Sequence, residues 1–214
     1  MDMYKRHRVE MVQRFVVDAG LKDPRIADAM RRIQRHRFVE PALAHQAYMD
    51  KSLPIGFGQT ISHPTTVAYM TQLLQLKGHE RILEIGTGSG YQAAVLAEIG
   101  VKVYSIERIG DLSRRVQKLF DELGYYTVGL RIGDGSLGWT AHAPYDRIIV
   151  TAGSPEPPKA LLAQLAEKGR MVIPVGGKTG QKLMIITRQA DKYDIIEHDF
   201  RDFVPLIGKK GWDL

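Results

Sequence analysis

The spacing of apolar residues changes once along the chain, near residue 80. Before that point the apolar positions recur at helical spacing. This pattern predicts helices over residues 9–19, 24–33, 38–47 and 64–75. Asp23 and Pro24 form a typical helix start, since Asp caps the first turn and Pro fits its first position. The glycine-rich segment 53–62 is predicted to be a turn-like loop.

From residue 81 onward, short apolar runs alternate with helical segments. The runs predict strands at 81–85, 101–106, 128–132, 145–151 and 169–175. The predicted helices between them are 93–99, 111–123 and 157–167. Two last strands, 182–187 and 194–198, are expected to pair antiparallel around an Asp191-Lys192-Tyr193 turn.

This alternation predicts an α/β protein with a Rossmann-like, doubly wound and mostly parallel sheet. We expect one domain over residues 1–214. Within it, residues 1–78 would form a helical cap and acceptor loop, and residues 79–214 the Rossmann-like core.

Composition removes several chemistries. The chain has 214 residues, 44% of them hydrophobic and 25% charged, which is ordinary for a globular protein. It has no cysteine, which excludes disulfides, thiolate metal sites and thiol nucleophiles. Its seven histidines show no ligand spacing, so no metal is expected. No apolar run approaches a membrane span and no secretion signal is seen, so we expect a cytoplasmic protein with no membrane partner.

The net charge of +6 is concentrated near the N-terminus. Residues 1–37 hold ten Lys and Arg against five acidic residues. A basic patch could bind nucleic acid or an anionic substrate. A solvated helical face is the favoured interpretation, because no aromatic residues are interleaved with the charges.

A glycine loop supplies the strongest local signal. The segment Glu84-Ile-Gly86-Thr-Gly88-Ser89-Gly90 follows a predicted strand and precedes a predicted helix. Its G-x-G-x-G spacing differs from the G-x-G-x-x-G of dinucleotide sites, so a nicotinamide dehydrogenase is disfavoured. The pattern suits S-adenosyl-L-methionine, which has no pyrophosphate. Gly86, Gly88 and Ser89 would approach this cofactor, and the Glu84 carboxylate would bind its ammonium group directly or through water.

Two more acidic residues follow the next predicted strands. Glu107 lies 21 residues after Gly86 and is placed to accept the ribose hydroxyls, with Arg108 beside it. Asp134, followed by Gly135, is placed to reach the adenine amino group. In this order on successive strand ends, the motifs favour an adenosyl cofactor.

Several segments resemble the protein-L-isoaspartate O-methyltransferases, also called protein-β-aspartate methyltransferases. The most specific is the run Leu-Pro-Ile-Gly-Phe-Gly-Gln-Thr-Ile-Ser at 53–62, followed by Pro64. Matching segments also occur at 84–94, 133–135, 143–152, 173–176 and 203–206. The resemblance extends from about residue 12 to residue 206.

The resemblance implies methylation of the α-carboxylate of L-isoaspartyl residues, a damage product of Asn and Asp. S-adenosyl-L-methionine would be converted to S-adenosyl-L-homocysteine, without a metal. The expected partners are isoaspartyl-containing proteins and peptides, with no specific nucleic acid, and we expect a monomer. The family sheet has seven strands, with the last two in an order exchanged from the usual one.

The resemblance also assigns residues. Ser62 takes the place of the family serine, as the catalytic residue and a cofactor contact, with Gln59, Thr60 and Ile61 as neighbouring cofactor contacts. The predicted substrate contacts are Ile55, Thr60, Ser62, Thr151, Ala152 and Val204.

The chemistry of a carboxylate acceptor agrees with these residues. A carboxylate is already ionised near neutral pH, so methyl transfer to it needs no general base. Ser62 would orient it by hydrogen bonding. An alternative role for Ser62 is to cap the helix that begins at Pro64.

Other functions remain open at this stage. An RNA or DNA methyltransferase is the main alternative, and a cofactor-binding protein without catalysis is another. Carbon-5 methylation of pyrimidines needs a cysteine, which is absent. The segment 151–158 lacks the aromatic residue typical of amine methylation and the acidic cluster of metal-dependent catechol-type enzymes.

Overall fold

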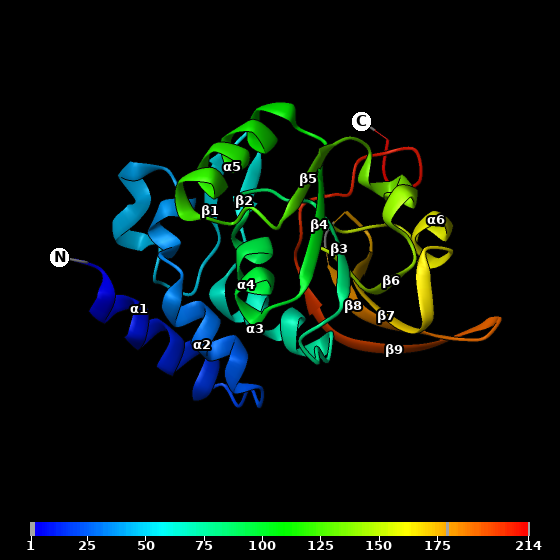
Figure 1. Cartoon of the computed structure of the whole chain (residues 1–214), viewed down its shortest axis with the longest axis horizontal. Helices are drawn as coiled ribbons and strands as arrows, with labels where there is room; N and C mark the ends of the chain where they lie inside the picture. The colour runs from blue at the N-terminus through cyan, green and yellow to red at the C-terminus, as the bar shows by residue number, and fades with distance from the viewer. Residues whose placement is uncertain (1–2, 179, 214) are drawn as a thin grey trace.

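A seven-stranded sheet is the centre of the computed structural model, which describes residues 3–178 and 180–213 (Figure 1). In spatial order its strands are β5 (Gly129–Ile132), β4 (Lys102–Glu107), β3 (Arg81–Ile85), β6 (Tyr145–Val150), β7 (Leu165–Gly176), β8 (Gln181–Gln189) and β9 (Lys192–Arg201). The first five run parallel, and β8 is antiparallel to both of its neighbours. The predicted fold class is confirmed, and the last two strands lie in chain order.

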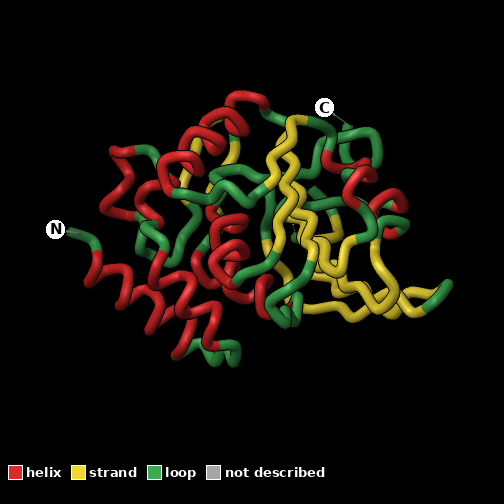
Figure 2. Tube along the Cα trace, viewed as in Figure 1, coloured by secondary structure: helices red, strands yellow, loops and turns green. Residues whose placement is uncertain are grey.

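Helices cover the sheet and extend beyond it at the N-terminal side (Figure 2). The α-helices are α1 (Lys5–Val12), α2 (Pro24–Arg32), α3 (Pro64–Leu73), α4 (Tyr91–Ile99), α5 (Gly110–Leu123) and the short α6 (Lys159–Leu162). A π-helical turn, Gln13–Val17, continues α1. The 3-10 turns are Arg35–Phe38, Pro41–Gln46, Gly135–Leu137 and Thr140–His142.

Both faces of the sheet are buried, which explains why its central strands are continuously apolar. Ile82 and its neighbours in the sheet pack into one core with α3, α4, α5 and the N-terminal helices. Leu83, one residue on, faces a second core that includes Leu161 of α6 and Leu206 near the C-terminus. Because α2 packs against α4, the N-terminal helices form an outer layer over the first core (Figure 1).

The segment predicted to be a turn-like loop is instead a two-stranded hairpin. Strands β1 (Leu53–Gly56) and β2 (Gln59–Ile61) pair antiparallel outside the main sheet. Phe57 and Gly58 both have positive φ, as a two-residue hairpin turn requires. The segment was predicted to be a loop because it is rich in glycine. The alternation of buried and exposed residues that marks a strand extends over only four residues in β1 and three in β2.

The helix predicted over 157–167 is also wrong beyond its first turn. Helix α6 ends at Leu162, and β7 already begins at Leu165. Leu165 pairs with Tyr145 of β6 and is fully buried. Pairing with β6 thus overrides the helical spacing of the leucines.

Three smaller predictions need correction. The helix expected over 9–19 begins earlier and changes to π geometry at Gln13. The helix expected over 38–47 consists of the two 3-10 turns that meet at Val39 and Glu40. The last hairpin turns at Ala190 and Asp191, because Gln189 pairs with Lys192.

Glu80, at the entry to β3, provides a stability test. Its carboxylate accepts hydrogen bonds from the backbone N–H groups of Lys77, Gly78 and His79. Burial acts to raise the pKa of Glu80, but these donors outweigh it and the pKa lies below its ordinary value. We expect Glu80→Ala to lower the free energy of unfolding by about 2–4 kcal/mol at pH 7. Thermal unfolding measures it.

The stabilisation should be present at neutral pH and lost as the pH falls through the lowered pKa of Glu80. Glu10→Ala, on the exposed face of α1, is the control and should leave the melting temperature close to that of the wild type. Equal melting temperatures for the two variants at neutral pH would contradict the assignment.

Candidate active site

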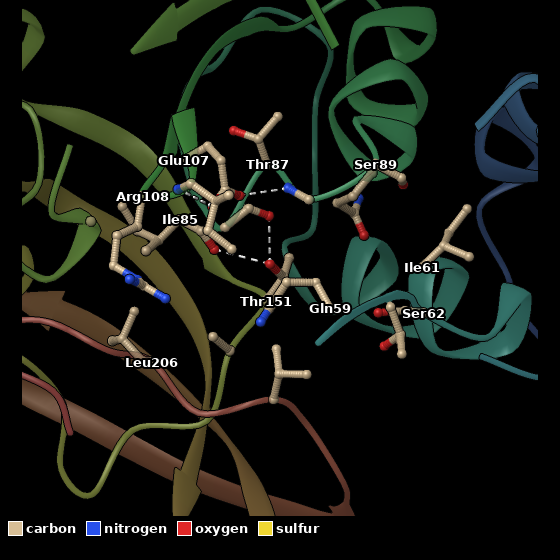
Figure 3. A pocket seen from close by; sticks show the side chains of 18 of the residues that line it. Gln59, Ile61, Ser62, Ile85, Thr87, Ser89, Glu107, Arg108, Thr151 and Leu206 are labelled. Carbon is tan, nitrogen blue, oxygen red and sulfur yellow. Dashed lines mark hydrogen bonds between the residues drawn. The ribbon is translucent and has the colours of Figure 1, made fainter. Parts of the chain in front are cut away.

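A cleft opens at the carboxyl ends of β3, β4 and β6 (Figure 3). Strand order reverses between β3 and β6, which is where ligands bind in doubly wound sheets. All the predicted site residues line this cleft except Ile55, Glu84 and Asp134. The predicted residues that line it are Gln59, Thr60, Ile61, Ser62, Gly86, Gly88, Ser89, Glu107, Arg108, Gly135, Thr151, Ala152 and Val204.

The glycine loop, residues 86–90, lies directly against Thr151 at the end of β6. The Thr151 hydroxyl donates to the carbonyl of Gly86 at 2.7 Å. A Cβ at position 86 would lie 2.5 Å from that hydroxyl, and the φ of +93° also favours glycine. Thr151 therefore holds the glycine loop through this hydrogen bond and also lines the cleft.

Glu107 connects the glycine loop to the end of β4. Its carboxylate oxygens accept hydrogen bonds from the N–H of Gly88 at 2.9 Å and of Ile109 at 2.8 Å. Each oxygen can accept one further hydrogen bond. Figure 3 shows Glu107 and Arg108 on one side of the cleft and Ser62 with Ile61 on the other. This carboxylate is suited to a pair of neighbouring hydroxyl groups.

Glu84 does not line the cleft, contrary to its predicted contact with an ammonium group. Its side chain is fully buried and accepts a hydrogen bond from the hydroxyl of Ser105. Ser105 in turn contacts the Thr87 hydroxyl at 2.6 Å, which links Glu84 to the glycine loop. Burial raises the pKa of Glu84 to about 8, so the carboxyl is largely protonated at neutral pH.

Asp134 is also turned away from the cleft, which Gly135 lines instead. Its carboxylate accepts hydrogen bonds from the N–H and hydroxyl of Ser136 and from the N–H of Lys209. It therefore secures the C-terminal segment, residues 203–212, against the loop after β5. The third misplaced residue, Ile55, is buried in β1 and lines a neighbouring cavity beside α5.

Ser62 does not cap helix α3. The N-cap residue is His63, whose side chain makes no capping hydrogen bond. The first turn of α3 is instead capped by Asp50, whose carboxylate accepts hydrogen bonds from the N–H and the hydroxyl of Thr65. Among the backbone and side-chain groups that the structure describes, the Ser62 hydroxyl has no hydrogen-bond partner, so it remains available to a ligand in the cleft. The capping interpretation of Ser62 is wrong.

Sequence reasoning missed Ile85, Thr87, Ile106 and Ile109, which stand beside predicted residues, and further lining residues on α3, α4 and the C-terminal segment. Thr66, Val67 and Met70 lie on α3, and the helical spacing that predicts this helix does not show which end of it meets a cleft. Tyr91 and Gln92 begin α4 and follow the glycine loop directly, a signal that could have identified them. Pro205, Leu206 and Ile207 of the C-terminal segment cover another side.

Within the part of the chain that the structure describes, no three His, Cys, Asp or Glu side chains gather as a metal site would require. In those same residues no helix is both long and apolar enough to cross a membrane.

The strand order and the cleft define a Rossmann-like methyltransferase fold. A solved structure named protein-L-isoaspartate O-methyltransferase has a TM-score of 0.87 and 28% identity, covering 95% of this chain and 67% of that one. A putative protein-L-isoaspartate O-methyltransferase from Plasmodium falciparum, solved with S-adenosyl-L-homocysteine, shares the fold, with a TM-score of 0.82 and 22% identity over 94% of this chain and 98% of its own.

A sequence model of the protein-L-isoaspartate(D-aspartate) O-methyltransferase (PCMT) family matches residues 6–211. The protein-L-isoaspartate O-methyltransferase of Syntrophus aciditrophicus (strain SB) is 50% identical over 99% of each chain. Protein-L-isoaspartate O-methyltransferase 2 of Geotalea uraniireducens (strain Rf4) is 51% identical over 96% of this chain and 95% of its own. The chain belongs to the protein-L-isoaspartate(D-aspartate) O-methyltransferase family.

Glu107→Ala should weaken cofactor binding, because it removes the carboxylate that faces the cleft from β4. We expect the affinity for S-adenosyl-L-homocysteine to fall by at least about tenfold, measured by titration calorimetry. Asp111→Ala, which removes an exposed carboxylate paired with Arg114, is the control and should bind normally. Unchanged affinity in Glu107→Ala would contradict the ribose assignment.

The Glu84→Gln variant distinguishes two roles of Glu84: a buried hydrogen-bonding group, or a contact to the ammonium group of the cofactor. In the native protein the pKa is raised from 4.5 to about 8, so the folded state holds a proton that the unfolded chain releases. Wild-type stability therefore falls as the pH rises through this interval, whereas glutamine does not titrate. Between pH 5 and pH 8, the melting temperature of the variant relative to wild type should rise by at least about 3 °C.

The same variant should bind S-adenosyl-L-homocysteine with an affinity within about threefold of wild type, since no charge at position 84 reaches the cleft. A tenfold or greater loss of affinity, with no change in the pH dependence of stability, would support the predicted contact between Glu84 and the ammonium group of the cofactor.

Proposed function

We propose that this chain transfers a methyl group from S-adenosyl-L-methionine to the α-carboxylate of L-isoaspartyl residues in proteins and peptides. Its family membership supports this activity. The observation that supports it most directly is the cleft, in which Ser62 lies across from Glu107 and has a hydroxyl without a hydrogen-bond partner among the described residues.

The residues of the cleft fit S-adenosyl-L-methionine. The glycine loop supplies close backbone approach, Glu107 supplies a carboxylate for the ribose hydroxyls, and Ile85 and Leu206 supply apolar walls. When bound, this cofactor supplies an electrophilic methyl group on a sulfonium sulfur. Gln59, Thr60 and Ile61 would hold it from the β2 side.

The protein's task is then to place and desolvate the acceptor. An isoaspartyl carboxylate is ionised at neutral pH and is itself the nucleophile, so the site needs neither a base nor a metal to activate it. Ser62 would donate a hydrogen bond that orients this carboxylate, with Thr60, Ala152 and Val204 as further substrate contacts.

Water exclusion follows from the apolar side chains of the cleft. Val67 and Met70 of α3 are buried and line it beside the hairpin. A carboxylate that loses its hydration shell becomes a stronger nucleophile toward a cation. The methyl ester so formed would cyclise to a succinimide, which partly hydrolyses to a normal aspartyl linkage and so repairs the chain.

We further propose that the protein acts as a cytoplasmic monomer, as one domain with no specific nucleic-acid partner. Ion pairs within the chain support the last point, since they satisfy several of the N-terminal arginines that suggested a nucleic-acid site. These pairs are Arg6–Glu10, Arg31–Asp28, Arg32–Glu98 and Arg37–Glu122. Structured RNA offered with labelled cofactor should therefore acquire no label.

Ser62→Ala tests the proposed role of the hydroxyl. We expect kcat on an L-isoaspartyl peptide to fall by about tenfold to a hundredfold, because the carboxylate loses its orienting donor. The affinity for S-adenosyl-L-homocysteine should stay within about threefold of wild type. Initial rates of methyl-ester formation and titration calorimetry measure the two effects.

Ser62→Thr, which keeps a hydroxyl, is the matched variant and should retain more of the rate. Wild-type kcat in Ser62→Ala would remove Ser62 from the mechanism.

A further inference from the structure

A buried arginine from the N-terminal extension reaches the backbone of Ser62. Arg35 is fully buried and lies in the 3-10 turn Arg35–Phe38. Its Nη2 donates to the carbonyl oxygen of Ser62 at 2.7 Å, and its Nε donates to the carbonyl oxygen of Ala47 at 2.8 Å. One guanidinium thus joins the extension to the residue that follows β2.

The same guanidinium also lies over the first residue of α4. The Arg35 Cζ is 4.6 Å from the centre of the Tyr91 ring, and Tyr91 is itself buried beside the glycine loop. Arg35 therefore contacts both sides of the cleft, the hairpin side through Ser62 and the glycine-loop side through Tyr91. The planar fork of arginine allows this, because its donors point in fixed and different directions.

This arrangement is costly for stability alone. Burying a guanidinium removes its hydration, and here it lowers the pKa of Arg35. The Nη1 atom has no hydrogen-bond partner among the described residues. An apolar side chain of similar size would fill the same space without that cost, but it would leave the Ser62 carbonyl without its donor.

We propose that Arg35 is a positioning residue for methyl transfer, which holds the Ser62 backbone so that the Ser62 hydroxyl faces the acceptor carboxylate. This inference rests on the proposed function of Ser62. The β1–β2 hairpin is not hydrogen-bonded into the main sheet, so the location of Ser62 depends on such side-chain contacts.

The chain offers a matched control in Arg8. Arg8 is also buried, and its Nε donates to a backbone carbonyl, that of Arg31, at 2.6 Å. Its carbonyl partner belongs to α2 rather than to the hairpin. Arg8→Lys and Arg35→Lys both replace a buried guanidinium with an ammonium group. A difference in kcat between the two variants therefore reflects where the guanidinium lies and not the loss of a buried guanidinium as such.

The experiment is a double-mutant cycle between positions 35 and 62. Arg35→Lys should lower kcat on an L-isoaspartyl peptide by about tenfold or more, with the affinity for S-adenosyl-L-homocysteine nearly unchanged. In the Ser62→Ala background the same substitution should change kcat by less than about twofold, because Arg35 acts through Ser62. Arg8→Lys should leave kcat near wild type while lowering the melting temperature. Arg35→Gln is the second variant if the lysine variant is poorly folded.

Hydrogen–deuterium exchange gives a readout that does not depend on activity. Arg35→Lys should speed exchange in peptides that span residues 59–63 by about tenfold, while peptides from β3 and β6 exchange as in wild type. Arg8→Lys should leave the 59–63 peptides unchanged.

Three outcomes would overturn the proposal, and they are distinguishable. Equal fold-losses of kcat in the wild-type and Ser62→Ala backgrounds would show that Arg35 acts independently of Ser62. Unchanged exchange at 59–63 would show that Arg35 does not hold this segment. Full activity of Ser62→Ala would contradict the proposed function of Ser62 itself, and the positioning role would fail with it.

Discussion

The hydrogen bond from Arg35 to the Ser62 carbonyl is the contact on which the geometry of the site depends. The parallel sheet fixes the glycine loop, Glu107 and Thr151 through its own ladder of backbone hydrogen bonds. The β1–β2 hairpin has no such connection, so its place opposite the glycine loop is determined by side chains. Leu53, Ile55 and Ile61 pack the hairpin against the first core, and the buried Arg35 guanidinium adds a donor of fixed direction at the Ser62 backbone.

An ionised acceptor explains what the cleft contains and what it does not need. Methyl transfer to an amine or hydroxyl is accompanied by the loss of a proton, whereas a carboxylate has none to lose at neutral pH. The proposed task of the polar groups that line the cleft is therefore to bind and orient, Glu107 the ribose of the cofactor and Ser62 the acceptor. Glu84, whose pKa is raised to about 8 by burial, lies behind the glycine loop.

Sequence reasoning predicted most of the sheet and most of the cleft, because apolar runs and strand-end motifs are local signals. It failed for Glu84, because alternation along β3 turns this side chain to Ser105 inside the core, and only the register with β4 reveals that. It failed for Asp134 because the C-terminal segment, about 75 residues later, occupies that carboxylate. The role proposed for Arg35 depends on contacts with residues 12 and 27 positions away, which no spacing rule shows.

The most direct test of the account uses labelled S-adenosyl-L-methionine and two peptides of the same sequence, one with L-isoaspartate and one with normal L-aspartate. We predict base-labile label on the isoaspartyl peptide alone, since the cleft is proposed to orient a main-chain α-carboxylate for attack. Equal labelling of both peptides, or of neither while the cofactor binds normally, would contradict the account.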